Sequence, residues 1–471
     1  MPLQKNQVLT LRVERLSSDG SGVAHSPDGE AVFIPGAAPG DEARVRIVKD
    51  CKRYAFGILD EVLTPSPDRI PVDCAVAGPC GGCSLRHLDY AAELRAKQEN
   101  VADAFARIGG LDVPVLPIVG SPEVNRYRNK VQFPVGVDKS GKPCIGFYAG
   151  RTHRIVPCPD CRLQPGVLNE IGNALCAFFA EKGIQPYSEE TGRGLVRHIF
   201  LRRGAHSGQI MVCLVCTRAK LPSAEELCTR LKAQFAEITT ILLNVNAKNT
   251  NVILGTETHT LYGQGYIEDT LCGVPVQLGP LSFYQVNTLA AEQLYGIAAQ
   301  YAQLTPDDLL LDLYCGMGTI GLSMAAHCRE LIGVEIVPEA IESAKANAAR
   351  MGADVAAKSR FFCADAGQAA TRLAAEGLHP DIVMLDPPRK GCDEATLSAV
   401  VRMSPRRVVY VSCNPATAAR DAAWLEQNGY HAEKVQPVDL FPRTRHCEAV
   451  LLLTKLHVER HIEVDVSMDE L

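Results

Sequence analysis

The 471-residue sequence has no long apolar run and few aromatic residues. No segment approaches the ~18 consecutive apolar residues of a membrane-spanning helix. The first residues, MPLQKNQVLTLRVERL, lack the apolar core of a secretion signal. Neither sign of charge dominates, because the formal net charge is −6, and aromatic residues make up 6% of the chain. We therefore expect a protein of the cytoplasm that is neither membrane-bound nor a general binder of polyanions.

Cysteine, in contrast, is abundant, with 18 residues. Without a secretion signal, these cysteines are better interpreted as free thiols, metal ligands or a nucleophile than as a disulfide framework. Hydrophobic residues make up 46% of the chain and charged residues 22%, which is ordinary for globular proteins. At ~150 residues per domain, the length predicts about three domains.

The pattern along the chain predicts three domains and a tail. Residues 1–63 alternate apolar and polar positions between glycine-rich turns, which is typical of a small OB-like β-barrel of four or five strands. Residues 64–280 combine a helical pattern at 90–109 with strand-like runs, which predicts an α+β domain. Residues 281–455 alternate apolar runs with alanine-rich helices, as in a doubly wound, Rossmann-like α/β domain. Residues 456–471 are polar and acidic and are interpreted as a tail.

A glycine-rich turn, DLYCGMGTIG, follows an apolar strand at residues 312–321. Glycines there let the backbone approach a ligand at the carboxyl end of a sheet. Glu335 ends the next expected strand, where an acidic side chain can accept hydrogen bonds from ribose hydroxyls, and Asp365 ends a third. The pattern predicts a site for NAD or S-adenosylmethionine. Taken alone, the glycines are also compatible with an ordinary tight turn.

Three more residues are expected at the same sheet edge. Asp386 closes a strand before two prolines, either as a rigid turn at the crevice or as a simple strand exit. Cys413 lies between a strand and Pro415, near a helix N-terminus whose dipole would lower a thiol pKa. Glu448 follows the basic loop FPRTRHC and is a candidate general base, with the arginines placed to contact phosphate. The alternatives are a buried structural cysteine and a salt-bridged strand residue, and Cys315 is the rival nucleophile.

Cysteines are concentrated in Cys74-x5-Cys80-Gly-Gly-Cys83 and in Cys158-Pro-Asp-Cys161. Two Cys-x-x-Cys pairs are the donor set of a four-thiolate zinc site. However, 74 residues separate these pairs, against the ~15–20 of zinc ribbons. An iron–sulfur cluster held by four thiolates is the alternative, and structural cysteines without a ligand are the third interpretation.

Basic residues are interleaved with aromatic ones between positions 126 and 154. This segment has seven Lys or Arg against one acid, Asp138, which suits phosphate contact and base stacking in unpaired RNA. Its aromatic residues are Tyr127, Phe133, Phe147 and Tyr148. A second basic group comprises Arg193, Arg197, His198, Arg202 and Arg203. A solvated charged face is the alternative interpretation.

Five motifs together suggest a family. DLYCGMG, LDPPRKG, VSCNP and HCEAV, with SFYQVN at 282–287, resemble the RumA/TrmA family of RNA uracil-5 methyltransferases. The N-terminal barrel is similar to the TRAM domain of the RumA branch. The resemblance implies methyl transfer from S-adenosylmethionine to C5 of a specific uridine in 23S ribosomal RNA. Transfer RNA as the substrate, a non-catalytic RNA-binding or assembly protein and, more distantly, an NAD-dependent oxidoreductase are the alternatives.

The resemblance also implies roles for individual residues. Cys413 would add to C6 of a uracil flipped out of its stack, and Glu448 would remove the C5 proton. Contacts to S-adenosylmethionine are expected from Gln285, Tyr314, Glu335, Asp365 and Asp386. A [4Fe–4S] cluster is implied on Cys74, Cys80, Cys83 and Cys161, with Cys158 as the other candidate for the fourth ligand. The resemblance implies neither a membrane nor a protein partner, and we expect a monomer.

Overall fold

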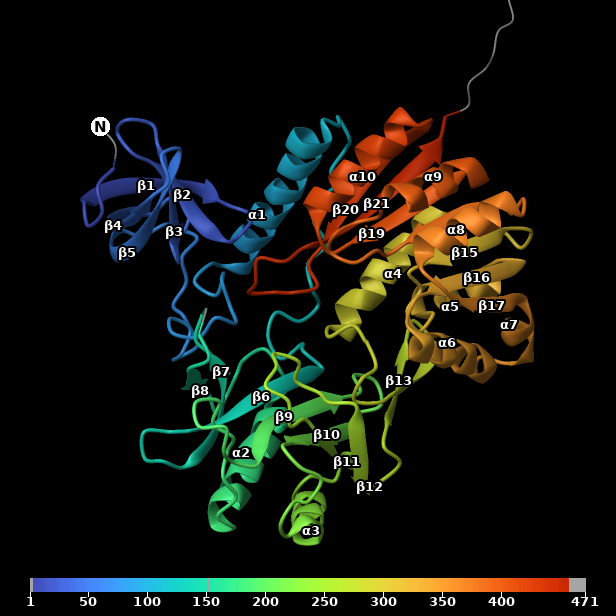
Figure 1. The fold of residues 1–471 in the computed structure, drawn as a ribbon. Coiled ribbons are helices and arrows are strands. Elements are labelled where there is room, and N and C mark those ends of the chain that lie inside the picture. Colours follow the sequence, from blue (N-terminus) through green and yellow to red (C-terminus); the bar gives the residue numbers. More distant parts are fainter. Residues whose placement is uncertain (1–2, 151, 457–471) are drawn as a thin grey trace, which may run out of the picture.

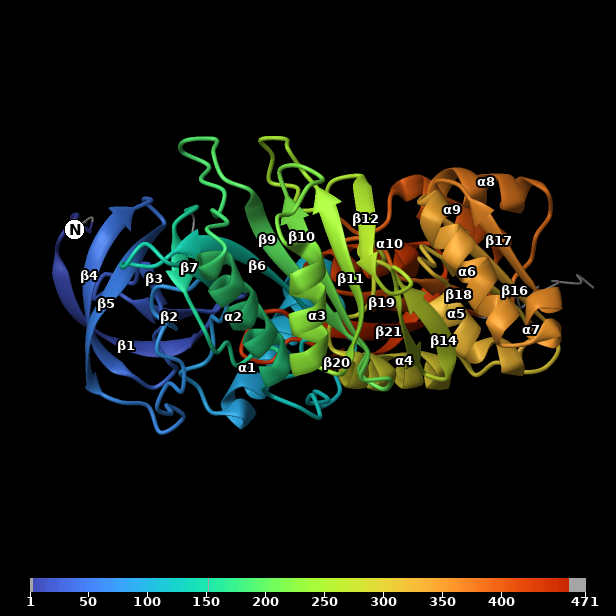
Figure 2. The ribbon, with the colours of Figure 1, turned by 90° about the horizontal axis from the view of Figure 1, so that it is seen from below.

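The computed structural model describes residues 3–150 and 152–456, which form a small barrel, a central sheet and a C-terminal sheet (Figures 1 and 2). The acidic tail expected at 456–471 lies, beyond Leu456, outside the described residues. Within the described residues, no helix has both the length and the apolar character needed to cross a membrane.

The predicted N-terminal barrel is confirmed and closes with five strands in the order β1-β2-β3-β5-β4. Its strands are β1 (Val8–Leu16), β2 (Ser21–His25), β3 (Ala31–Pro35), β4 (Glu42–Asp50) and β5 (Tyr54–Thr64). In β4, Ala43, Val45 and Ile47 are buried while the residues between them are exposed, as the alternating pattern requires. Strand β2 lies where the sequence shows only glycine-rich turns. A Cβ at Gly22 would be 2.8 Å from Val13 Cγ1, so close packing requires glycine there.

A helix after the barrel packs on the C-terminal sheet. Helix α1 (Tyr90–Asp103) begins at Asp89, whose carboxylate accepts the N–H groups of Ala91 and Ala92, and it continues as a π-helical turn, η1 (Ala104–Gly109). Gly110 ends it with φ 63°, which confirms the predicted helix and its glycine cap. Val101 and Phe105 are buried in the apolar core beneath the C-terminal sheet.

The central sheet has seven strands in the order β12-β11-β10-β9-β6-β7-β8. They are β6 (Lys130–Val137), β7 (Pro143–Tyr148), β8 (Ile155–Pro157), β9 (Val196–Arg203), β10 (Ile210–Cys216), β11 (Ile238–Val245) and β12 (Glu257–Tyr262). Helices α2 (Gly166–Glu181) and α3 (Ala224–Gln234) share one apolar core with this sheet. The strands β13 (Ile267–Leu271) and β14 (Val274–Leu278) form a hairpin. The hairpin shares one apolar core with the other face of the central sheet and with the C-terminal part, since this core contains both Phe200 of β9 and Leu294.

The C-terminal sheet has seven strands in the order β17-β16-β15-β18-β19-β21-β20. They are β15 (Leu309–Leu313), β16 (Glu330–Glu335), β17 (Ser359–Cys363), β18 (Ile382–Leu385), β19 (Arg407–Ser412), β20 (Tyr430–Val438) and β21 (Glu448–Lys455). Its helical elements are α4 (Thr288–Ala302), α5 (Thr319–Met324), η2 (Ala325–His327), α6 (Pro338–Arg350), α7 (Ala353–Lys358), α8 (Ala366–Ala375), α9 (Glu394–Met403) and α10 (Pro415–Gln427).

Helices cover both faces of this sheet, which explains its continuous apolar strands. Leu310 joins the core with α4 and α5, whereas Leu311 joins the core with α9 and α10. The chain runs outward from β15 in both directions, and β21 is antiparallel to both of its neighbours. The predicted doubly wound α/β fold is therefore confirmed. In such sheets a ligand crevice lies at the carboxyl ends of the strands where the order reverses, here between β15 and β18.

A buried charged group joins α1 to the segment between β20 and β21. The Lys97 ammonium contacts Glu93 Oε1 at 2.7 Å and Asp439 Oδ1 at 2.8 Å, and all three side chains are at most 1% exposed. Burial alone would lower the pKa of Lys97, but the two carboxylates outweigh this effect and raise it. Tyr90 adds a hydrogen bond to the other oxygen of Asp439 at 2.9 Å.

Replacing Lys97 should strongly destabilise the protein. Lys97→Met removes the ammonium that contacts both buried carboxylates, which we expect to cost about 3–5 kcal/mol and to lower the unfolding temperature. Lys345→Met is the matched control, because Lys345 pairs with Glu342 on an exposed helix face and should change stability by less than about 1 kcal/mol. Denaturant unfolding of both variants measures the difference, and equal stabilities would contradict the expectation.

Candidate active site

The register of β19 and β21 brings Cys413 and Glu448 to one edge of the C-terminal sheet. Ser412 of β19 is paired with Ala449 of β21, and the two strands are antiparallel. Cys413, the residue after Ser412, therefore lies opposite Glu448, the residue before Ala449, at the carboxyl end of β19. Asp386 follows β18, whose last residue is level with Tyr410 of β19. Three side chains that are distant in sequence therefore share one location. Glu448 is 6% exposed, and Cys413 is half-buried.

Burial dominates the electrostatics of this group. It raises the pKa of Glu448 to about 8, and the charge of Asp386 adds to the effect while Arg389 opposes it. Burial also raises the pKa of Asp386 to about 7. The expectation that the helix N-terminus lowers the pKa of Cys413 is wrong. Burial and the charges of Glu448 and Asp386 raise that pKa to about 11, against a smaller opposing effect of Arg389.

The turn that carries Cys413 is tied to the proline-rich turn after Asp386. Asn414 Nδ2 donates to Arg389 O at 2.9 Å, and Thr417 Oγ1 donates to the same oxygen at 3.3 Å. Pro415 occupies the first turn of α10, as predicted, and the Asn414 side chain caps the helix. These contacts hold Cys413 and Asp386 in a defined relative position.

The glycine-rich turn after β15 is organised by two carboxylates. Glu335 accepts the Gly316 N–H at 3.2 Å and the Val337 N–H at 2.9 Å. Asp312 accepts the Gly321 N–H at 3.0 Å, and its other oxygen is buried without a hydrogen-bond partner. Burial raises the pKa of Asp312 to about 8. Asp312 is not among the predicted site residues, although its place before the glycines is a usable signal in the sequence.

The other predicted cofactor contacts lie in segments that follow strands β14, β15 and β17. Gln285 lies between β14 and α4, and its carbonyl accepts from Asn129 Nδ2 at 2.8 Å. Burial raises the pKa of Tyr295, and the charge of Asp386 adds to this effect while the Gln285 side chain opposes it. Tyr314 has φ 65°, a left-handed conformation in the turn after β15. Asp365 caps α8 by accepting the Gln368 N–H at 3.1 Å.

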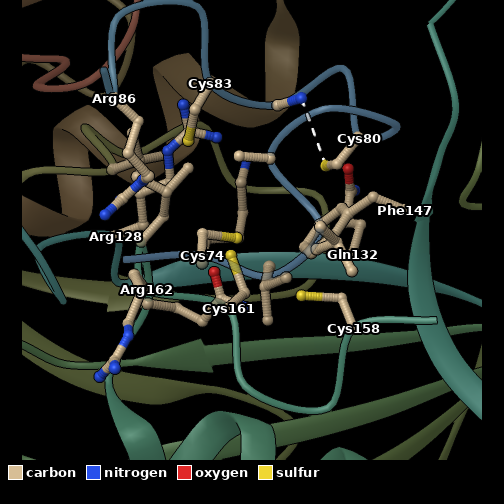
Figure 3. Close-up of a pocket in the computed structure, with 18 residues that line it drawn as sticks. Cys74, Cys80, Cys83, Arg86, Arg128, Gln132, Phe147, Cys158, Cys161 and Arg162 are labelled. Atoms are coloured by element: carbon tan, nitrogen blue, oxygen red, sulfur yellow. Dashed lines mark hydrogen bonds between the residues drawn. The ribbon is translucent and has the colours of Figure 1, made fainter. Parts of the chain in front are cut away.

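The cysteines of both motifs line one cavity of about 250 Å³ between the segment after the barrel and the central sheet (Figure 3). The lining includes Cys74, Cys80, Cys83, Cys158 and Cys161. Four cationic side chains, those of Arg86, Arg128, Lys130 and Arg162, line it as well. Cysteine sulfurs can bind a metal cluster as thiolates, and the neighbouring cations would offset the negative charge of such a cluster.

The arrangement of these thiols does not establish a metal centre. Across residues 3–150 and 152–456, no group of three or more His, Cys, Asp or Glu side chains is placed to hold a metal ion. The predicted [4Fe–4S] cluster is thus not supported by the geometry. Cys158 and Cys161 interact directly, and this hydrogen bond lowers the pKa of Cys161 and raises that of Cys158. Of these two cysteines, Cys161 is the better thiolate donor.

The basic surface is smaller than the sequence suggests. Tyr127 and Phe133 are core residues, at 5% and 0% exposure, so only Phe147 and Tyr148 of the four aromatic residues are half-exposed. The second basic group is largely internal as well. Arg202 is 1% exposed and donates to Gly279 O and Ser282 O, and Arg197 donates to Asn246 O. These arginines fix loops of the protein, so they are not exposed to phosphate.

The arginines before Glu448 also differ from each other. Arg443 is 9% exposed, and its guanidinium donates to Leu88 O at 2.7 Å, so the expectation that it contacts phosphate is wrong. Arg445 is exposed and remains compatible with such a contact.

The fold defines a Rossmann-like α/β domain, with a glycine-rich turn at the carboxyl edge of its sheet, that is preceded by a small closed β-barrel. Residues 204–456 match the tRNA (uracil-5-)-methyltransferase family model, and residues 2–59 match the TRAM domain. A relative named as an RNA methyltransferase in Halalkalibacterium halodurans is 43% identical over 453 residues, covering 96% of this chain and 98% of the relative. Another in Oceanobacillus iheyensis is 41% identical over 455 residues, with coverages of 96% and 98%.

A solved structure is similar over nearly the whole chain. The Pyrococcus abyssi tRNA (uracil-54, C5)-methyltransferase, in complex with S-adenosyl-L-homocysteine, is 26% identical with a TM-score of 0.75. The match covers 95% of this chain and 100% of the solved one. The chain therefore belongs to the tRNA (uracil-5-)-methyltransferase family and carries a TRAM domain, which confirms the resemblance found in the sequence.

The raised pKa of Glu448 predicts a pH-dependent reaction rate. A general base must be ionised to accept a proton, and the ionised fraction of Glu448 increases as the pH rises through about 8. We expect the rate at which methylated RNA is released from its covalent adduct, measured in a single turnover, to increase from pH 6 to 8 and to level off above that range. The rate should be measured with saturating RNA in buffers of constant ionic strength. A rate that is constant, or that falls, over this interval would contradict the assignment.

Proposed function

We propose that the protein methylates C5 of a uridine in RNA, with S-adenosylmethionine as the methyl donor and 23S ribosomal RNA as the first candidate substrate. The observation that carries this proposal is the placement of Cys413 opposite Glu448 at the carboxyl edge of the sheet. A nucleophile and a base from adjacent strands are what substitution at an unreactive ring carbon requires.

The proposed reaction uses each of these residues once. The Cys413 thiolate bonds to C6 of uracil, and the electron pair of the C5–C6 double bond moves into an enolate. C5 then attacks the sulfonium methyl group, which leaves S-adenosylhomocysteine. The Glu448 carboxylate removes the C5 proton, the double bond re-forms, and the Cys413–C6 bond breaks. Because the pKa of Cys413 is raised, the thiol must lose its proton to a nearby base before it attacks.

The methyl donor would occupy the crevice beside the glycine-rich turn. Glu335 ends β16 and is placed to accept ribose hydroxyls, while Gln285 and Asp386 lie toward the reacting centre. Asp365 follows β17 at the same edge, beside the expected position of the base of the nucleoside. Tyr314 would contact the donor from the turn after β15. The crevice at the switch between β15 and β18 supports this placement.

Ribosomal RNA and transfer RNA are the two candidate substrates. The resemblance favours ribosomal RNA because the TRAM barrel is typical of that branch of the family. The match to the solved tRNA enzyme covers 95% of this chain. The unmatched part is shorter than the barrel at residues 8–64, so the match includes residues of the barrel. The barrel therefore does not separate the two substrates, and transfer RNA is the second candidate. A non-catalytic RNA-binding role is less favoured because Cys413 and Glu448 lie together.

Labelling distinguishes these candidates. We expect tritium from S-adenosyl-L-[methyl-³H]methionine to appear as 5-methyluridine in unmodified 23S ribosomal RNA, and not in transfer RNA transcripts, after nucleoside digestion. Cys413→Ala should lose this activity by several orders of magnitude and still bind S-adenosylmethionine in equilibrium dialysis, because the thiol is not needed for donor binding. Label in transfer RNA alone would select the second candidate. Activity retained by Cys413→Ala would exclude the covalent mechanism.

We also propose that the cysteine cavity holds a [4Fe–4S] cluster on Cys74, Cys80, Cys83 and Cys161. Support comes from the family resemblance, from the shared cavity of these thiols and from the four cations around it. When bound, such a cluster would supply a compact cross-link between the segment after the barrel and the central sheet. No step of the methyl transfer is assigned to it.

Metal analysis tests the cluster. Protein purified without oxygen should be brown, absorb broadly near ~400 nm and contain about four irons per chain. Cys161→Ser should lose most of this iron, whereas Cys228→Ser, which alters a half-buried cysteine outside the cavity, should not. Stoichiometric zinc in place of iron would favour the zinc alternative, and a metal-free protein would leave structural thiols as the interpretation.

A further inference from the structure

The segment between β20 and β21, residues 439–447, is largely buried although it has no regular secondary structure. Asp439, Leu440, Pro442 and Thr444 are buried, and Glu448 follows directly as the first residue of β21. A buried irregular segment must have its polar backbone groups satisfied by other parts of the protein. The elements that supply these partners therefore determine where Glu448 lies.

Two of these partners come from the cysteine-rich segment after the barrel. The N–H groups of Ser84 and Leu85, which directly follow Cys83, donate to the Arg443 carbonyl at 3.0 and 3.1 Å. Arg443 has φ 67°, a left-handed conformation that is unfavourable for a residue with a side chain. This conformation persists because Arg443 is held from several sides.

The remaining contacts of Arg443 come from α1 and the turn before it. Its N–H donates to Glu93 Oε1 at 2.7 Å, so the backbone of Arg443 is attached to the buried Lys97 group. Its guanidinium donates to Leu88 O at 2.7 Å and lies 3.6 Å from the other Glu93 oxygen. The side chain thus fastens the segment to the same helix that carries the buried charges.

Pro442, the residue before Arg443, is bound by the segment around Tyr127, which in turn is attached to the second cysteine motif. The Tyr127 hydroxyl donates to the Pro442 carbonyl at 2.9 Å. On either side of Tyr127, the N–H groups of Arg126 and Arg128 donate to the carbonyls of residues 162 and 163, next to Cys161. The segment after Cys83 and the segment around Tyr127 therefore bind the carbonyls of two adjacent residues, Arg443 and Pro442. These residues lie five and six positions before Glu448.

We propose that Arg443 is a positioning residue for Glu448, and that it acts by fastening residues 439–447 to α1 and to the segment that follows Cys83. Tyr127 is the second fastening point. This inference rests on the proposed function, because it takes Glu448 to be the base that removes the C5 proton. Within the part of the chain that the structure describes, the hydrogen bonds and ion pairs of Arg443 lead to α1, to the turn before it and to the segment after Cys83, and none leads to Cys413. Its effect is therefore expected on proton removal and not on donor or RNA binding.

The test separates formation of the covalent adduct from its resolution. A base that is misplaced leaves Cys413 attack and methyl transfer intact, so the adduct forms but breaks down slowly. Arg443→Gln should resolve the adduct up to about 100-fold more slowly than the wild type, with its formation rate and the KM for RNA changed by less than about threefold. Rapid quench followed by denaturing gels with ³²P-labelled RNA measures both rates, using whichever RNA accepts the methyl label.

Four further variants make the result interpretable. Glu448→Gln should accumulate the adduct most strongly, and Arg230→Gln, on the exposed face of α3, should match the wild type. Arg443→Lys, which keeps the positive charge, should recover part of the resolution rate. Tyr127→Phe removes one buried hydroxyl at nearly constant volume, so it reports the same slow resolution if Arg443→Gln does not fold. A several-fold slowing is expected for Tyr127→Phe.

Two outcomes would overturn the inference. One is a wild-type resolution rate in Tyr127→Phe and in a folded Arg443→Gln. The other is an equal slowing of adduct formation and resolution, which would indicate general damage to the site. Failure of the proposed function is recognised separately, because Glu448→Gln would then accumulate no adduct.

Discussion

The buried contact of Lys97 with Glu93 and Asp439 connects the parts of this molecule. Three charged side chains at most 1% exposed are stable only while all of them are present, since removing one leaves another charge in a medium of low polarity. Through Asp439 the group holds the start of the segment before Glu448, and through Glu93 it holds the Arg443 N–H. The placement of the candidate base thus depends on a helix more than 300 residues earlier in the chain.

The same burial that orders the site also determines its chemistry. Glu448, Asp386 and Cys413 come from three neighbouring strand ends, and little solvent remains to stabilise their charges. Their pKa values all rise, so burial favours the neutral forms of these three groups. Arg389 is the cation that opposes this effect at both Glu448 and Cys413. Its carbonyl also fixes the turn that carries Cys413, so one residue contributes to both geometry and charge.

Much of the fold was predictable because local patterns dictated it. The helix that begins after Asp89 and ends at Gly110 follows from a capping carboxylate and a glycine that accepts φ 63°. The strands at the carboxyl edge, including those before Asp386 and Cys413, follow from short apolar runs that end in turn residues. Strand β2 escaped prediction because its glycine, Gly22, is required by close packing against Val13 and Ala37, a contact that is not visible in sequence.

The candidate site was predictable only in part, for a related reason. Cys413, Glu448 and the cysteine motifs stand out by residue type and spacing. Cys413 and Glu448 do meet at one sheet edge, and the cysteines of the two motifs do line one cavity. The environment of each group was not predictable. Arg443 and Arg445 are two residues apart in one basic loop, yet one is buried against Leu88 O and the other is exposed. Tyr127 and Phe133 belong to the core although they alternate with cations.

By itself, the sequence determined most elements of this protein, the family to which it belongs and the candidate residues for its chemistry. These properties reside in residue type, in period and in short spacings, which are local. The tertiary structure alone decided which charges are buried, which pKa values rise and which arginines face solvent. Such properties depend on what other segments place around a side chain, and α1 and residues 439–447 meet only after the chain has folded.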